Sequence, residues 1–179
     1  MADTDERDEA AVAAARAAVA DAVRTLTTAG ARDEALAEYV PRRRTLGIPR
    51  EPVLRPLGRV WRLGVVLLGP DGTLYATGSL IRATPVGRPQ NLSGTAEARR
   101  ALRAAAERGH FAPGETVDFD ARPIELSSDA LRASRGPVFL REGRLLVRWS
   151  AAAGDANARE FVPYLAERVE LLAHPPEGA

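Results

Sequence analysis

The sequence contains neither lysine nor cysteine, and this double absence excludes several kinds of chemistry. All 25 lysine-or-arginine positions are arginine, and the two histidines are His110 and His174. Without lysine there is no Schiff base and no phosphate-loop lysine. Without cysteine there is no thiol nucleophile, disulfide or zinc–thiolate site. The remaining carboxylates, hydroxyls, guanidinium groups and imidazoles form no recognisable catalytic motif. We therefore expect no catalytic residues, no metal site and no cofactor.

Asparagine and isoleucine are scarce as well, with two and three copies, whereas alanine, arginine, glycine and proline are abundant. This profile is typical of a GC-rich coding sequence, which explains the exclusive use of arginine without any role in nucleic-acid binding. The formal net charge of +1 agrees, since dedicated nucleic-acid domains are usually far more basic. A chain of 179 residues suits one domain with a helical appendage.

Signals for export or membrane insertion are also missing. The first nine residues are rich in acidic side chains, where a secretory signal would be basic. No apolar stretch approaches the roughly 18 residues of a membrane span. We therefore expect a cytoplasmic protein that does not associate with membranes.

The charge is distributed unevenly along the chain. Residues 1–40 carry four arginines against nine acids, whereas residues 41–62 carry seven arginines against one glutamate. Two interpretations of this basic block, which includes Arg42, Arg43 and Arg44, stay open. It neutralises the acidic N-terminal segment, which we favour, or it contacts the phosphates of a nucleic acid or another anion. No aromatic residue is interleaved between Tyr39 and Trp61, as a single-strand binding surface would require.

The N-terminal 40 residues favour two helices. Residues 5–29 are rich in alanine, begin with acids and are followed by Gly30, a suitable helix end. Residues 32–40 are predicted to form a second, shorter helix, so the segment would be a helical hairpin. The first helix carries a narrow apolar stripe, which is either a dimer seam or a face packed on the chain's own core: Val12, Val19, Val23 and Leu26.

Four prolines follow within residues 41–58, at Pro41, Pro49, Pro52 and Pro56. Neither a helix nor the interior of a sheet tolerates proline at this density. We therefore predict an extended linker, partly of polyproline type.

The remaining sequence predicts a single α+β domain. Short apolar runs separated by turn residues, such as Pro70-Asp71-Gly72, indicate strands, and the second hairpin is predicted at residues 138–149 with its turn at Glu142-Gly143. Apolar residues three or four apart indicate helices at about residues 95–108 and 163–173, and residues 127–133 favour a short capped helical turn. The predicted fold is a small antiparallel sheet of two hairpins plus one strand, with helices packed on one face. The expected parts are the helical extension 1–40, the linker 41–58, the core domain 59–174 and a flexible tail 175–179.

Each predicted hairpin contains one tryptophan, Trp61 or Trp149. Because both hairpins share the main apolar surface of this domain, we expect the two residues in neighbouring strands. Their rings should then be largely buried.

The start of the helix predicted near residue 95 could bind an anion. Ser93, Gly94 and Thr95 would present free backbone amides to a phosphate or carboxylate, and Arg99 would assist. The alternative is that this motif only caps the helix.

Two acids further along, Asp118 and Asp120, are two residues apart in a predicted strand and would share one face. Paired carboxylates could hold a metal ion or transfer protons. The alternative is that they face solvent or pair with arginine.

Residues 58–78, together with residues 39–41, 113–117 and 146–149, resemble a family of small uncharacterised proteins from high-GC Gram-positive bacteria. The resemblance covers roughly residues 36–172, and its motifs are elements of the fold. Some members of that family carry the label glutaminase, which implies amide hydrolysis. The serine-type glutaminases use a Ser-x-x-Lys nucleophile and the amidotransferase type uses cysteine, and this chain has neither lysine nor cysteine.

These observations favour a non-enzymatic cytoplasmic domain that binds a protein partner or itself. One alternative is an arginine-mediated binder of nucleic acid or another anion, with Arg42, Arg43, Arg44, Ser93, Thr95 and Arg99 as its candidate residues. The second alternative is an amide hydrolase of unrecognised mechanism.

Overall fold

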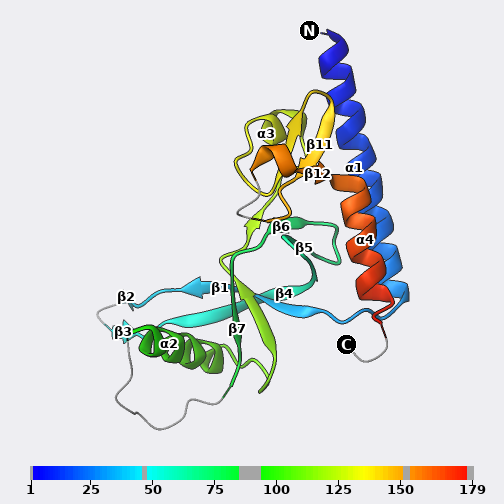
Figure 1. Cartoon of the computed structure of the whole chain (residues 1–179). Coiled ribbons are helices and arrows are strands. Elements are labelled where there is room, and N and C mark those ends of the chain that lie inside the picture. The colour runs from blue at the N-terminus through cyan, green and yellow to red at the C-terminus, as the bar shows by residue number, and fades with distance from the viewer. Residues whose placement is uncertain (1, 46–47, 85–93, 151–153, 177–179) are drawn as a thin grey trace. The chain divides into compact units, whose positions relative to one another are not determined.

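The computed structural model describes residues 2–45, 48–84, 94–150 and 154–176 (Figure 1). The chain forms two compact units, each of which has its own hydrophobic core. Unit 1 comprises residues 1–33, 61–76 and 122–179, and unit 2 comprises residues 34–60 and 77–121.

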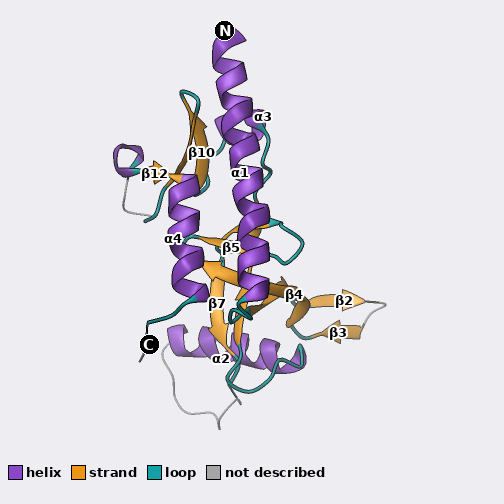
Figure 2. Ribbon diagram, turned by 90° about the vertical axis from the view of Figure 1, so that its right-hand side faces the viewer, coloured by secondary structure: helices purple, strands orange, loops and turns teal. Residues whose placement is uncertain are grey.

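Unit 1 is built around two long helices, α1 (Ala2–Thr28) and α4 (Phe161–Ala173). They lie side by side and run in the same direction (Figures 1 and 2). The other elements of unit 1 are the end of β4 (Val53–Leu63), β5 (Val66–Leu68), β6 (Leu74–Ala76), β9 (Arg122–Pro123), α3 (Ser128–Arg132), β10 (Val138–Arg141), β11 (Arg144–Val147), η1 (Asp155–Asn157) and β12 (Arg159–Glu160).

The apolar stripe of α1 forms one wall of the unit 1 core. Val12, Val19 and Leu26 are buried together with Ala15 and Ala22, at the three- and four-residue spacing of a helix face. They pack with residues of α4 and of the strands, Phe161 and Leu165 among them. The stripe therefore faces the chain's own core, which was one of the two interpretations of the sequence.

Tight turns join the strands of unit 1. Gly64, at φ 71°, lies in the two-residue connection between β4 and β5, where Leu63 pairs with Val66. A side chain there would collide with the hydroxyl of Tyr164, which accepts a hydrogen bond from the Val65 amide at 3.1 Å. Glycine is therefore required at this position both by the backbone and by the close packing of α4.

Unit 2 contains β1 (Glu34–Val40), β2 (Arg43–Thr45), β3 (Ile48–Arg50), residues 53–60 of β4, β7 (Ser79–Arg82), α2 (Gly94–Arg108) and β8 (Thr116–Phe119). β1 pairs with β4 in the antiparallel sense and with β8 in the parallel sense, and β7 pairs with β8. Ala105 and Ala106 of α2 are buried against residues of these strands. Small side chains let this helix approach the sheet closely.

The predicted fold class was wrong in its sheet. Strand pairing runs in the order β7-β8-β1-β4-β5-β6-β9, which makes a seven-stranded mixed sheet in which β4 belongs to both units. Two further sheets have three strands, β10-β11-β12, and two strands, β2-β3. The protein is α+β, but a small sheet of two hairpins plus one strand does not describe it.

The predicted helix at residues 32–40 was also wrong, because residues 34–40 form strand β1. This segment, EALAEYV, is rich in helix formers, but its buried residues pair with β4 and β8 on both sides. Tertiary pairing therefore overrides a weak local propensity. The helical hairpin expected at the N-terminus is a single helix followed by a strand.

The proline-rich segment predicted as a linker contributes three strands. Pro49 lies in the short hairpin β2–β3, and Pro56 lies in β4 opposite Ala37. The register shifts here, so that Leu57 has no partner in β1 and its side chain is exposed. Strands tolerate proline next to such a bulge, because the regular ladder is interrupted there.

The predicted burial of the two tryptophan rings is confirmed only for Trp61. Its side chain is 7% exposed, and its indole N–H donates to the carbonyl of Ala31 at 3.2 Å. Trp149 follows the end of β11 and is 49% exposed. The two residues are not in neighbouring strands, since Trp149 lies outside β11 and β11 pairs with β10 and β12 and not with β4.

Candidate functional site

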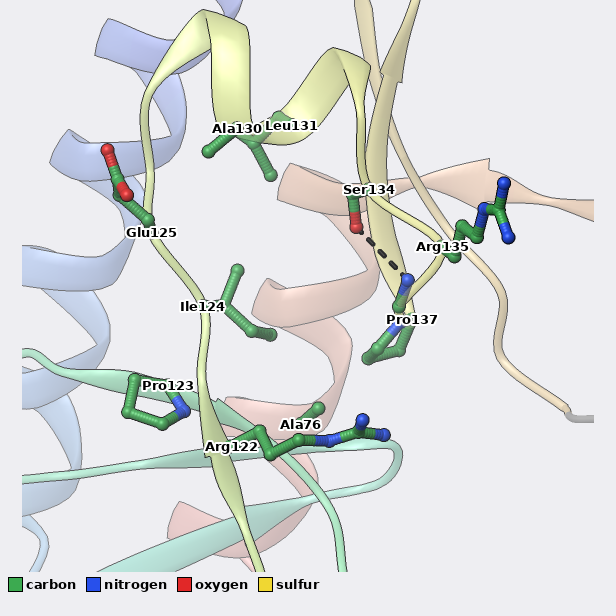
Figure 3. Close-up of a pocket in the computed structure, with 11 residues that line it drawn as sticks. Ala76, Arg122, Pro123, Ile124, Glu125, Ala130, Leu131, Ser134, Arg135 and Pro137 are labelled. Carbon is green, nitrogen blue, oxygen red and sulfur yellow. Dashed lines mark hydrogen bonds between the residues drawn. The ribbon is translucent and has the colours of Figure 1, made fainter.

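A cleft of about 600 Å³ opens in unit 1 between β9 and α3 (Figure 3). Its lining comes from the end of β6, from residues 122–125, from α3 and from the segment 134–137 that precedes β10. We call it the unit 1 cleft. A volume of this size lies within the range of ligand-binding pockets.

The unit 1 cleft has a lining that is about half apolar and half polar. Ile124 points into it, and Ala130, Leu131, Ala76 and Pro137 complete its walls (Figure 3). Leu131 belongs to the unit 1 core and Ile124 packs against that core, so the floor of the cleft is continuous with packed interior. An apolar group that enters this cleft would therefore be removed from water.

Two arginines lie on the rim of the cleft, and their charges are not neutralised within the described residues. The side chains of Arg122 and Arg135 make no hydrogen bond or ion pair there. Glu125, the one carboxylate of the lining, points away from the cavity and accepts a hydrogen bond from Ser127 Oγ at 2.8 Å (Figure 3). The rim therefore carries positive charge, although the Arg135 side chain extends outward from the cavity (Figure 3).

Ser134 is the hydroxyl-bearing residue of the lining, and it is already engaged on both sides. Its Oγ donates to the carbonyl of Val138 at 2.6 Å and accepts from the amide of Gly136 at 3.1 Å (Figure 3). Arg148 also donates to the Gly136 carbonyl, and its guanidinium lies 3.9 Å from the centre of the Phe139 ring. These bonds fix the shape of segment 134–137. The hydroxyl serves the structure, because no base accepts its proton.

α1 fixes the opposite wall of the cleft. Arg16 donates to the carbonyl of Leu126, with Nε at 3.1 Å, and Glu9 accepts from Ser128 Oγ at 2.5 Å. As predicted from the sequence, the segment after residue 126 is a short capped helix, and Ser127 is its N-cap, accepting from the Ala130 amide. The cleft is thus formed before any ligand binds.

A buried carboxylate strengthens the attachment of α1 to α3. Asp8 of α1 is 3% exposed, accepts from Arg132 Nε at 2.6 Å and accepts from the Gly143 amide at 3.0 Å. The hydrogen bond to Asp8 raises the pKa of Arg132. Gly143 lies with Glu142 in the β10–β11 turn, and both residues have positive φ, as a two-residue hairpin turn requires. Asp8 therefore ties α1 to both α3 and this hairpin.

The structure does not bring the sequence-predicted anion-site residues together. Arg42 forms an exposed ion pair with Glu51 at 2.7 Å. Arg43 lines a second cleft, in unit 2, and Arg44 belongs to β2. Thr95 and Arg99 are exposed in the first turns of α2, whereas the last residue of that helix, Arg108, lines the unit 2 cleft, about 20 Å from Thr95 and about 14 Å from Arg99 along the helix axis. Ser93 lies outside the described residues.

The basic block pairs partly with acids of its own unit. Glu38 accepts from Arg55, and Glu115 accepts from Arg59. The acids of α1 pair elsewhere: Asp3 with Arg7, Asp21 with Arg24, and Asp5 and Asp8 with Arg132. Glu38 lies in the acidic segment 1–40, so its pair with Arg55 agrees with neutralisation of that segment by the block, whereas these acids of α1 pair with arginines outside the block.

The other candidates for chemistry are separated as well. His110 and His174 are exposed and belong to different units. Asp118 is buried in β8, whereas Asp120 is exposed after the strand ends, at φ 57°, so the two carboxylates do not share a strand face. Within the described residues, no group of three or more His, Asp or Glu side chains could hold a metal ion.

Nothing in the sequence marked Arg122, Ile124 and Arg135 as a group. They are separated in the chain, and none belongs to a recognisable motif. They line one cleft because residue 124 follows the edge strand β9 and residue 135 follows α3. Only the cap at Ser127 could have located this part of the site.

Comparison of the chain with models of known protein families, with curated proteins and with solved structures gave no match. Among the helices of the described residues, none has the length and apolar character needed to span a membrane.

Proposed function

We propose that this protein is a non-enzymatic binding domain whose unit 1 cleft receives an apolar side chain of a protein partner. Acidic residues of the partner on either side of that side chain would pair with Arg122 and Arg135. One observation carries the proposal: a preformed cleft with apolar side chains in its interior lies beside two arginines that have no charged partner among the described residues.

The chemistry of the cleft favours recognition over catalysis. Burial of an apolar anchor provides most of the affinity in interfaces of this kind, and charges on the rim mainly provide selectivity and faster association. Ser134 is hydrogen-bonded to the main chain, and the lining includes no histidine. The proposal of an amide hydrolase therefore finds no candidate nucleophile in this cleft.

Selection of displayed random peptides on the purified full chain tests the proposal. We expect the selected peptides to share an apolar residue flanked by Asp or Glu. Ala130→Trp, which fills the cleft, should abolish their binding, and the double change Arg122→Gln and Arg135→Gln should weaken it about tenfold or more. The matched control is the double change Arg99→Gln and Arg103→Gln, on exposed arginines of α2.

Circular dichroism and melting should show that the variants are folded. Equal binding to wild type and Ala130→Trp would contradict the proposal. The same holds if the selected peptides share no such pattern, or if the control pair weakens binding as much as the pair on the rim.

The glutaminase label of the family that the sequence resembles implies hydrolysis of glutamine, in contrast to the binding function proposed here. An assay for ammonia release tests this directly. We expect that no activity that releases ammonia from glutamine will co-purify with the protein. Release that is abolished by Ser134→Ala would replace the binding proposal with a hydrolase whose nucleophile is Ser134.

A further inference from the structure

A second cleft, of about 430 Å³, lies within unit 2. We call it the unit 2 cleft. Its walls are the end of β1, Arg43 of β2, the beginning of β4 and the last residues of α2 with His110. It belongs to a different unit from the unit 1 cleft, so it is a separate site.

Three arginines, Arg43, Arg55 and Arg108, line the unit 2 cleft. Arg55 is paired with Glu38, the one carboxylate of the lining. This leaves Arg43, whose side chain has no partner among the described residues, and Arg108, which has no carboxylate partner there. The formal charge of the lining is therefore positive even when His110 is neutral.

Arg108 is held in position for binding. Its Nε–H donates to the carbonyl of Pro52 at 2.6 Å, which fixes the guanidinium across the end of the helix. Its two terminal amino groups make no hydrogen bond with the described residues. A guanidinium anchored through Nε can present both of these groups to one oxyanion.

The end of α2 has an unusual order of residues. Gly109 has a normal φ, and His110, at φ 61°, takes the left-handed position that glycine usually occupies at a helix end. Gly109 must lack a side chain, because a Cβ there would collide with the carbonyl of Leu54 and the ring of Phe111. The chain thus places an imidazole at the cleft in a backbone conformation that would suit glycine better.

The helix end repels an anion less than an uncapped one would. Amides of the following residues satisfy the carbonyls of the last turns: Gly109 with Ala105 and Ala106, His110 with Glu107, and Phe111 with Ala106. These carbonyls are therefore not free to face a ligand. Arg108 and His110 lie where positive charge is favoured by the helix dipole.

We infer that the unit 2 cleft binds a small phosphate monoester. The phosphate, which carries nearly two negative charges at neutral pH, would be held by Arg43 and Arg108 with His110 beside them. The organic part would lie against the apolar and aromatic residues of the lining, Tyr39, Val40, Val53 and Pro56. This site does not depend on the binding of a protein partner in unit 1.

Titration of the full chain with phenyl phosphate, followed by calorimetry and by amide NMR shifts, tests this inference. We expect saturable binding with shifts at Gly109 and His110. Arg43→Gln and Arg108→Gln should each weaken binding about tenfold. Arg99→Gln and Arg103→Gln, on exposed faces of the same helix, are the controls and should leave it unchanged.

His110→Gly separates folding from binding. It relieves the backbone conformation, so the variant should be at least as stable as the wild type, yet it should bind phenyl phosphate more weakly. Absence of saturable binding to the wild type at millimolar phenyl phosphate would overturn the inference. Equal weakening by the control variants would also overturn it.

A single-stranded oligonucleotide distinguishes a nucleic-acid surface from a small-molecule site. We expect phenyl phosphate to bind more tightly than inorganic phosphate, because the apolar wall contributes. If the oligonucleotide binds with a steep salt dependence that Arg42→Gln and Arg43→Gln reduce, while phenyl phosphate does not bind, the inference is wrong and the basic block is a nucleic-acid surface.

Discussion

The two units reach a packed interior by different means. Of the nineteen buried residues in the unit 1 core, two are alanine, whereas five of the nine in the unit 2 core are alanine. Unit 1 therefore excludes water with large side chains from long helices and several strands. Unit 2 depends on the close approach of a small-residue helix to its strands. A core of this second kind contains less apolar surface, so each large side chain carries a greater share of its stability.

Ionisable groups give a second comparison between the two units. The carboxyl groups of Asp71, Asp155 and Glu167, whose pKa values are lowered, all lie in unit 1. Hydrogen bonds from Arg148 to Asp155 and from Arg159 to Glu167 are the main causes, and the Thr73 amide has this effect on Asp71. Unit 1 thus combines a large core with carboxylates that favour the folded state only when charged.

The largest expected effect is the loss of a large core side chain. Phe161→Ala in unit 1 should lower the free energy of unfolding by about 3–5 kcal/mol, and Leu54→Ala in unit 2 by about 2–5 kcal/mol, because both side chains are fully buried. Hydrogen exchange should show lost protection concentrated in the mutated unit. If either variant lowered protection equally in both units, the two cores would not be independent.

A smaller effect is expected from filling the close contact in unit 2. Gly109→Ala should destabilise by about 1–3 kcal/mol, since its Cβ has no room beside Leu54. Gly94→Ala at the start of the same helix meets no atom within 4 Å and should be neutral or stabilise by less than about 1 kcal/mol. Denaturant unfolding of both variants measures the difference, and similar values would mean that close approach does not limit unit 2.

Removal of the buried carboxylate in unit 1 should have an effect of similar or smaller size. Asp8→Ala leaves Nε of Arg132 and the Gly143 amide without their acceptor and should cost about 1–3 kcal/mol. Asp3→Ala, which removes an exposed partner of Arg7 on the same helix, should cost less than about 0.5 kcal/mol. Thermal melts compare the two, and an equal loss would show that burial of Asp8 contributes nothing.

As the pH is lowered, unit 1 should lose folding stability before unit 2. The loss should be smallest near neutral pH. A carboxyl group whose pKa is lower in the folded than in the unfolded state stabilises the fold above its ordinary pKa. This contribution is lost as the pH falls through the lowered value. We expect melting temperature to fall below about pH 4, and less steeply in Asp155→Asn than in the wild type.

NMR signals during acid titration can locate this effect. Signals of unit 1 should weaken at a higher pH than those of unit 2. Earlier loss in unit 2, or an unchanged pH dependence in Asp155→Asn, would contradict the assignment of acid sensitivity to the unit 1 carboxylates.

Elements with a strong local signal could be predicted from the sequence. α1, α2 and α4 were expected close to their observed ranges, and so were the capped turn at Ser127 and the β10–β11 hairpin. In each case the apolar spacing, a cap or a turn residue carries the information. β1 was missed because its residues favour a helix, and the strands among the prolines were missed because a bulge permits what a regular ladder forbids.

The candidate sites were harder to predict, for a related reason. Arg43 was identified by its place in a basic block, but its neighbours in the unit 2 cleft, Arg108 and His110, follow it by more than sixty residues. Arg122 and Arg135 belong to no motif. Arginine is also the general basic residue of this chain, so its presence at a position says little until the structure shows which arginines lack a partner.

The sequence by itself determined which residue types for chemistry are absent, that α1, α2 and α4 are helices and which turns are tight, because these depend on residue type and short-range spacing. The tertiary structure decided that residues 34–40 pair as a strand, that the chain has two cores and that two clefts are bordered by arginines. These features depend on contacts between distant segments. Such contacts are set by the packing of many side chains at once, which no local pattern in the chain records.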